Sequence, residues 1–259
     1  MELTNANYYS AEANMAYWSV SSFKEFDRCE AAGLAAVRTE YVREETDALL
    51  IGSYVDAYYS GELGLFLDEH REAMFSKRGG GLLAKYKRAD DMIQTVNSDP
   101  LMMEYLLGEK QQIFTAELFG VPWKVKADIY KPGVRIVDFK TVKDFADVWD
   151  PGYGYRSWVE FWQYDVQGAI YQKVIEKATG EHLPFYLEAV TKEKVPDKAI
   201  IQIPQHVLDA ALGMVEAKIE RFDLIKAGEV EPRRCECCDY CKATKRLTGP
   251  TVYEIREAE

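Results

Sequence analysis

The chain has 259 residues, of which 47% are hydrophobic, and no linker divides it, so we expect one domain spanning residues 1–259. Its net charge of −11 counts against a protein that coats nucleic acid by bulk attraction. An enzyme that grips a few phosphates through metal ions and a local basic patch remains compatible with that charge. The sequence contains no run of about 18 apolar residues, so no transmembrane helix is predicted. The first residues lack the basic-then-apolar order of a signal peptide. A soluble cytoplasmic protein is expected.

The N-terminal part, residues 1 to about 110, is predicted to be helical. Apolar residues at helical spacing predict helices over residues 19–40 and 46–60. A glycine loop at residues 79–81 then precedes a charged helix that ends near Asn97, and a short helix follows Pro100.

The middle part, residues 111–230, is predicted to carry the sheet. Alternating side chains predict strands over residues 113–119, 123–130 and 134–141, which form an antiparallel meander. An aromatic loop leads to a helix over residues 157–178, two strands near 185–190 and 199–203, and a helix over 205–227. A Cys-rich segment, residues 231–259, follows. This order predicts an α+β protein with helices flanking a mixed or antiparallel sheet.

The stretch from Val134 to Lys140 places an acid and a lysine on one face of a strand, which is expensive to bury without a function. Asp138 is that acid, and Asp128 lies on the preceding strand, so the two carboxylates can converge. Two carboxylates and a substrate phosphate suit Mg²⁺. Lys140 could position a water, lower its pKa or neutralise developing charge. Glu117 is a further candidate ligand, and an ordinary surface hairpin is the alternative.

These residues, followed by Gln167-Gly-Ala-Ile-Tyr171, resemble the PD-(D/E)XK nuclease superfamily, and within it the RecB-type and phage RecE-like exonucleases. The resemblance implies a restriction-endonuclease-like core in which Asp128 and Asp138 bind Mg²⁺ or Mn²⁺ and Lys140 assists the attacking water. Gln167 and Tyr171 are four residues apart and share a helix face. Gln167 would then bond a water or phosphate, and Tyr171 would stack on or bond to DNA. A core-facing helix is the alternative for this pair.

The family's Gly-x-x-x-His motif, whose His can bind the metal, corresponds here to Gly52-Ser-Tyr-Val-Asp56. An aspartate therefore replaces the histidine. A carboxylate is a harder ligand that suits Mg²⁺ or Mn²⁺, so the resemblance makes Asp56 a third candidate metal ligand. An exposed helical aspartate is the alternative.

Five cysteines are present, and the odd count without a secretory signal disfavours a disulfide framework. Cys235, Cys238 and Cys241 form a C-x₂-C-x₂-C run, with Cys29 as a distant fourth and Cys237 left over or replacing Cys238. The pattern resembles RecB-type nucleases, including AddB-like and CRISPR-adaptation members, that tie one N-terminal and three C-terminal cysteines to a structural [4Fe–4S] cluster. Zn²⁺ needs the same four thiolates. Free thiols in a C-terminal turn are the alternative.

Three surface clusters are candidates for nucleic-acid contacts, although solvated helix faces and loop packing would give the same patterns. Two are basic and one is aromatic: residues Lys77, Arg78, Lys85, Lys87 and Arg88; residues Arg233, Arg234, Lys242, Lys245 and Arg246; and residues Trp149, Tyr153, Tyr155, Trp158, Phe161 and Trp162.

By resemblance, the chain is expected to be a metal-dependent DNA exonuclease of phage or prophage recombination or DNA repair. A single-strand annealing protein is the expected partner, and a ring-like homo-oligomer the expected assembly. Two alternatives remain open. One is an endonuclease or nickase on the same fold, and the other is a non-catalytic DNA-binding module organised by a cysteine-bound metal.

Overall fold

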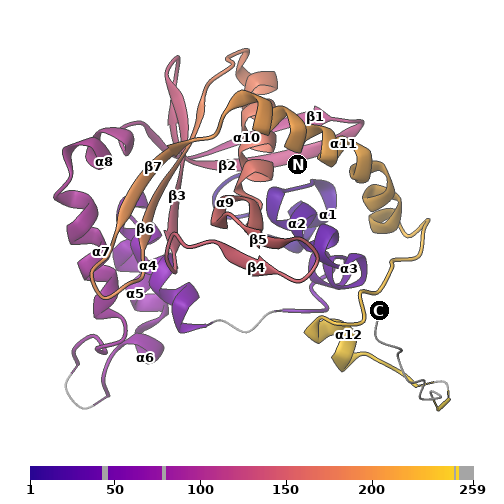
Figure 1. Ribbon diagram of the computed structural model, residues 1–259, viewed down its shortest axis with the longest axis horizontal. Helices are drawn as coiled ribbons and strands as arrows, with labels where there is room; N and C mark the ends of the chain where they lie inside the picture. The colour runs from indigo at the N-terminus through magenta and orange to yellow at the C-terminus, as the bar shows by residue number, and fades with distance from the viewer. Residues whose placement is uncertain (43–45, 78–79, 248, 251–259) are drawn as a thin grey trace.

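A five-stranded sheet forms the centre of the protein (Figure 1). The computed structural model describes residues 1–42, 46–77, 80–247 and 249–250. The strand order is β1-β2-β3-β6-β7, with β3 and β6 parallel and the other neighbours antiparallel. The strands are β1 (Glu109–Leu118), β2 (Val121–Lys131), β3 (Arg135–Val142), β6 (Phe185–Thr191) and β7 (Lys198–Gln202). The mixed sheet confirms the predicted α+β class.

Helices cover both faces of the sheet, and Figure 1 shows α4 to α8 on one side and α1 to α3 and α11 on the other. We call the side of the sheet that α10 covers the α10 face. The core on this side includes Trp18, Phe23, Ile170 and Phe222. It is covered by α2 (Val20–Arg28), α3 (Glu30–Val37), α10 (Tyr164–Thr179) and α11 (Gln205–Ala227). The opposite α4 face is covered by α4 (Asp47–Ser60), α7 (Lys87–Asn97) and α8 (Pro100–Tyr105).

The remaining elements are short. They are α1 (Ala11–Ala16), α5 (Leu63–Glu69), α6 (Arg71–Met74), the hairpin of β4 (Val148–Asp150) and β5 (Gly154–Arg156), α9 (Trp158–Phe161) and α12 (Asp239–Ala243). None of the described helices combines the length and apolarity needed to cross a membrane. Parts of the predicted glycine loop, of the first basic cluster and of the Cys-rich segment, namely residues 78–79, 248 and 251–259, lie outside the described residues.

The helix predicted over residues 19–40 is two helices, so that prediction was wrong in its continuity. Ser19 begins α2 with a capping box, and Cys29 ends it in an extended conformation (φ −164°, ψ 111°) before α3 starts. The two helices then pack very closely, since a Cβ on Gly33 would lie 2.7 Å from the backbone nitrogen of Phe26. The break therefore turns the chain and places the buried Cys29 beside the C-terminal cysteines.

The helix predicted over residues 157–178 is also interrupted. Gln163 adopts a left-handed conformation (φ 53°) between α9 and α10, and its side-chain amide donates to Asp27 at 2.7 Å. A non-glycine residue in this region is strained, and the contact to α2 holds it there. The break separates Trp162 from the helix that carries Gln167.

The first hairpin turns more tightly than predicted. Its loop is Phe119–Gly120 with both φ values positive (55° and 78°), where residues 120–122 were expected. Two positive φ values are typical of the two-residue type I′ turn that matches strand twist. The strand β1 also begins at Glu109, four residues earlier than predicted.

We expect Glu188→Gln to stabilise the protein at alkaline pH. Glu188 is fully buried on β6 and neither carboxyl oxygen accepts a hydrogen bond within the described chain. Burial raises its pKa from 4.5 to about 8, so folding suppresses an ionisation that the unfolded chain undergoes above pH 4.5. The free-energy cost of keeping Glu188 protonated in the fold grows between pH 4.5 and 8. Glu188→Gln removes this cost, so it should raise the free energy of unfolding by about 2–4 kcal/mol at pH 8 and by little at pH 4.5. Denaturant unfolding at both pH values measures the gain.

Glu109→Gln, at an exposed position on β1, is the control and should change the free energy of unfolding little at either pH. A gain for Glu188→Gln that is equal at both pH values would contradict this account, since it would owe nothing to ionisation.

Candidate active site

The two acids of the predicted motif lie where the central sheet divides. Residue pairing between β2 and β3 ends at Ile129↔Val137, and Asp128 and Asp138 are the next two residues in that register. Beyond this point β3 pairs with β6, while β2 continues alongside β1. Their carboxylates line one cavity of about 280 Å³ at the fork.

Asp138 is the most deeply placed carboxylate of this cavity, with 1% of its surface exposed. Gln167 Nε2 donates to its Oδ1 at 2.6 Å, and Lys140 Nζ lies 2.6 Å from its Oδ2. Oδ2 thus faces the Lys140 ammonium, and its second lone pair remains available to a cation. The predicted proximity of Asp138 and Lys140 is therefore present in the structure.

The charges of Asp138 and Lys140 depend on each other. Burial raises the pKa of Asp138 to about 7, against the opposing effect of the Lys140 ammonium. Burial alone would lower the pKa of Lys140, but Asp138 and then Asp128 raise it above its ordinary value. Lys140 is consequently a protonated cation at neutral pH, and a divalent cation beside Asp138 would favour the charged carboxylate.

Asp128 and Asp56 complete an acidic wall. Asp128 Oδ2 accepts the backbone N–H of Phe139 at 3.0 Å, and its Oδ1 accepts from Gln111 Nε2 at 3.2 Å. Asp56, on α4, lines the same cavity at its exposed rim. Surrounding protein atoms, and next the charge of Asp128, raise the pKa of Asp56 to about 6.

Three acids of like charge in one cavity repel each other, and a cation placed between them relieves this repulsion. Oxygen donors at Asp56, Asp128 and Asp138, with the free lone pair on Asp138 Oδ2, match the ligands that Mg²⁺ or Mn²⁺ prefers. The residues present therefore fit a hard divalent cation.

The helix α10 brings both residues of the Gln-x-x-x-Tyr motif to the cavity. The Tyr171 hydroxyl donates to the carbonyl of Lys126 at 3.1 Å, and its ring packs on Phe185 in a T-shaped contact. This arrangement attaches α10 to β2. The contact of Tyr171 with DNA stays a prediction.

Lys24 is a site residue that sequence reasoning missed. Its Nζ donates to the carbonyl of Trp162 at 3.0 Å and to Gln167 Oε1 at 3.4 Å, so it holds the amide whose other end bonds Asp138. Burial, and next the charge of Lys140, lowers the pKa of Lys24 to about 7. No spacing rule connects it to the motif, because it comes from α2.

The N-terminal segment also contributes to the cavity, which the sequence did not reveal. Tyr8 and Tyr9 line it, and Lys124 anchors the segment by donating to the carbonyl of Tyr8 and to Asn14 Oδ1. Glu117, in contrast, is exposed six residues beyond Gln111 along β1, about 20 Å away at strand spacing. The prediction that Glu117 approaches the metal was wrong.

The second predicted site assembles from both ends of the chain. The sulfur atoms of Cys29, Cys235, Cys238 and Cys241 all lie within 4.8 Å of one another, with Cys29 and Cys241 at 3.5 Å and Cys235 and Cys241 at 3.9 Å. Cys237 is exposed and outside the group. Cys238 thus belongs to the four-cysteine group, and Cys237 is the cysteine left over rather than a replacement for Cys238.

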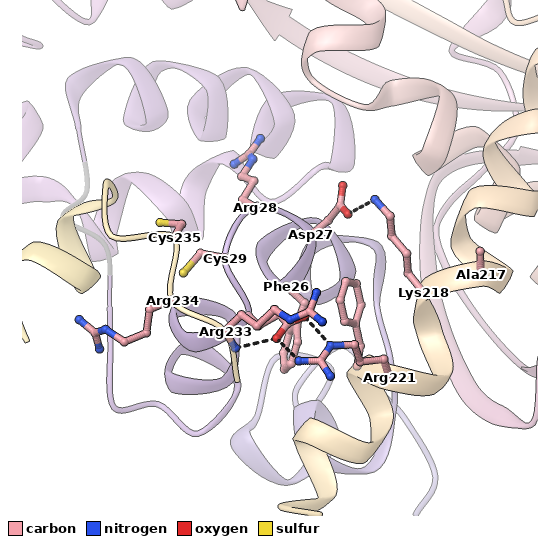
Figure 2. Close-up of a pocket in the computed structure, with 12 residues that line it drawn as sticks. Phe26, Asp27, Arg28, Cys29, Ala217, Lys218, Arg221, Arg233, Arg234 and Cys235 are labelled. Atoms are coloured by element: carbon pink, nitrogen blue, oxygen red, sulfur yellow. Dashed lines mark hydrogen bonds and ion pairs between the residues drawn. The ribbon is translucent and has the colours of Figure 1, made fainter. Parts of the chain in front are cut away.

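An ion pair with a buried glutamate holds the two halves of the cysteine site together. Glu30, next to Cys29, accepts two hydrogen bonds from Arg221 of α11, at 2.8 and 2.9 Å, and one from the backbone N–H of Arg233 at 2.7 Å. Figure 2 shows Cys29 and Cys235 side by side at this junction, with Asp27 pointing to Lys218 on α11. The same α2–α3 corner therefore contacts both the cysteines and α11.

The sequence profile of a family described as "PDDEXK-like domain of unknown function (DUF3799)" matches residues 19–244. The chain belongs to this family. In the solved structures, a candidate exonuclease from Eubacterium rectale is 42% identical, with a TM-score of 0.92 and a match that covers 97% of each chain. The comparison with curated proteins gave no match. Membership of the PDDEXK-like family confirms the PD-(D/E)XK resemblance and the restriction-endonuclease-like core, and both findings support a nuclease.

We expect Gly168→Ala to destabilise this PDDEXK-like domain and to displace Gln167. A Cβ on Gly168 would lie 2.5 Å from the Phe185 ring and 2.9 Å from Leu208, so α10 would have to move away from the sheet. Overpacking of this kind costs about 1–3 kcal/mol. Thermal and denaturant unfolding measure the loss.

Gly213→Ala on α11 is a matched control, because nothing lies within 4 Å of the added Cβ. The same change there should stabilise the helix by up to about 1 kcal/mol. If both variants gained stability, the close approach of α10 to β6 would be disproved.

Proposed function

We propose that the protein is a Mg²⁺- or Mn²⁺-dependent deoxyribonuclease that degrades DNA from its ends. The observation that carries this proposal is the convergence of Asp128, Asp138, Lys140 and Gln167 in one cavity at the fork of the sheet. The family and the described exonuclease neighbour add support. DNA is the substrate in this proposal.

Asp56, Asp128 and Asp138 would hold the metal, which supplies a water of lowered pKa and charge stabilisation at the phosphoryl oxygens. The chain's own residues prepare the site for it. The backbone N–H of Phe139 and the amide of Gln111 fix the Asp128 carboxylate, and Gln167 fixes that of Asp138.

Lys140 acts as a cation in this proposal. Because its neighbours hold its pKa above the ordinary value, its ammonium has no free lone pair with which to accept a proton at neutral pH. It can donate hydrogen bonds to the attacking water or to a phosphate oxygen as negative charge grows there. The structure thus favours the positioning and neutralising roles among those expected for Lys140.

The finer parts of the proposal rest on the resemblance. They are the exonuclease mode, a role in phage or prophage recombination or in repair, a single-strand annealing protein as partner, a homo-oligomeric assembly and a cytoplasmic location. An endonuclease or nickase would use the same cavity, so substrate topology distinguishes the modes.

Digestion of end-labelled linear duplex and covalently closed circular DNA tests the proposal, with Mg²⁺, Mn²⁺ or EDTA. The wild type should degrade the linear DNA only, and only with metal. Lys140→Ala should lower the rate by at least about 100-fold, since charge-stabilising donors contribute on this scale, when both proteins are assayed well below their melting temperatures. Cleaved circles would indicate an endonuclease, and no cleavage with any metal would leave a binding module as the better account.

We further propose that the four-cysteine site holds a single structural ion such as Zn²⁺. Tetrahedral Zn²⁺ with Zn–S bonds of about 2.3 Å places its sulfurs about 3.8 Å apart, close to the 3.5 and 3.9 Å seen here. Four irons at the centre of a [4Fe–4S] cluster would spread the thiolates farther apart. This spacing favours one ion over the cluster that the resemblance implied.

Elemental analysis of protein purified without oxygen tests the cysteine proposal. The wild type and Cys237→Ser should carry about one equivalent of zinc and no iron, because Cys237 lies outside the group. Cys241→Ser should lose the metal and melt at a lower temperature. Four irons with sulfide in the wild type would overturn the single-ion proposal, and metal loss in Cys237→Ser would overturn the ligand set.

A further inference from the structure

A second and larger cavity, of about 770 Å³, lies along the same elements as the catalytic one and has mostly apolar walls. Three elements run from one cavity into the other. The strand β3 carries Lys140 in the first and Thr141 in the second, with Lys143 just after its end, α4 carries Asp56 and Leu49, and α10 carries Gln167 and Tyr164. We call this second cavity the exit groove.

Four cations line the exit groove of a chain whose net charge is −11. Arg88 Nη1 donates to the carbonyl of Lys192 at 2.7 Å, and Lys192 Nζ reaches the carbonyl of Thr141 at 3.3 Å. Lys85 and Lys143 are more exposed and each contacts an aspartate, at 2.6 and 3.3 Å. Two of the four cations, Arg88 and Lys192, thus contact backbone carbonyls, while Lys85 and Lys143 also pair with carboxylates.

Apolar and aromatic side chains lie between these charges. Trp162 and Leu49 are 44% and 57% exposed in spite of their size. The Tyr164 ring lines the groove, and its centroid is 5.7 Å from Lys140 Nζ, which connects the groove wall to the catalytic lysine. Alternating cations and apolar surfaces are the features that single-stranded nucleic acid contacts, through its phosphates and its unstacked bases respectively.

We propose that the exit groove binds the single-stranded end of the nucleic acid whose scissile phosphate lies in the catalytic cavity. This inference rests on the proposed nuclease function and adds the form of its substrate. From Asp138 on β3 to Lys143, one residue past its end, an extended chain spans about 16 Å, so several nucleotides would lie between them. A duplex would offer phosphates to the cations but would keep its bases stacked away from the apolar wall.

Binding of a fluorescent 12-nucleotide single strand and of a 12-base-pair blunt duplex, measured by anisotropy in EDTA, tests this proposal. Lys143→Glu removes a groove cation whose side chain is 94% exposed, so folding should be unaffected. It should weaken single-strand binding about tenfold and flatten its salt dependence. Trp162→Ala should weaken single-strand binding by roughly tenfold, the scale of one stacked base. It should change duplex binding much less.

Lys177→Glu is the matched control, because it makes the same change in net charge at an exposed lysine near the far end of α10. It should alter affinity by less than about twofold. Equal losses for Lys143→Glu and Lys177→Glu, or no loss of single-strand affinity in either groove variant, would overturn the proposal. So would a Trp162→Ala defect confined to duplex.

Metal-dependent digestion of the same labelled DNAs by the wild type separates this inference from the proposed function. If the wild type cleaves DNA and the groove variants bind single strands as well as it does, the exit-groove proposal is wrong and the nuclease proposal stands. If the groove variants lose single-strand binding but the wild type cleaves no DNA, the nuclease proposal is wrong, and so is the placement of a scissile phosphate in the catalytic cavity.

Discussion

The division of the central sheet after Ile129↔Val137 is the constraint on which the rest of the site depends. Two carboxylates that are neighbours in register face each other where the backbone ladder has just ended. If the pairing continued, the strands themselves would occupy the space that the cavity now takes. The fork therefore brings charge together and leaves room for a cation between its two arms.

Such a site would be unstable without compensating groups from other elements. The amide of Gln167, the ammonium of Lys140 and the backbone N–H of Phe139 each satisfy part of the acidic cluster. These groups need precise placement, and the close contact of Gly168 with β6 lets α10 come near enough. Lys24 then fixes the other end of the Gln167 side chain.

The corner between α2 and α3 links the two candidate sites. Asp27 holds Gln163, which begins α10, and also pairs with Lys218 of α11. Two residues later Cys29 enters the four-cysteine group, beside Glu30 and its partner Arg221. A metal at the cysteines would thus brace the corner against which the catalytic helix is held.

Much of this was accessible from the sequence, and for physical reasons. Strand alternation and turn residues predicted the meander, and the meander placed Asp128 opposite Asp138. Helical spacing put Gln167 and Tyr171 on one face. The ligand set of the cysteine site was predicted from spacing and resemblance, although the choice between Cys237 and Cys238 required coordinates.

Other features depend on tertiary contacts that no local pattern encodes. The breaks at Cys29 and Gln163 are stabilised by partners far away in the chain, and local propensity favoured continuous helices in both places. Lys24 reaches the site only because α2 packs against α10. Glu117 looked suitable because strand alternation fixes the face of a side chain but not how far along the strand the cavity extends.

Binding of Mn²⁺ to the DNA-free protein, followed by electron paramagnetic resonance, tests the central claim most directly. Asp128→Asn removes one carboxylate charge at the fork, while Glu117→Gln removes an exposed carboxylate from the same sheet. We expect the wild type and Glu117→Gln to bind Mn²⁺ alike, and Asp128→Asn to bind at least about tenfold more weakly, on the scale of a lost charged ligand. Equal binding by all three proteins would show that the fork is not a metal site.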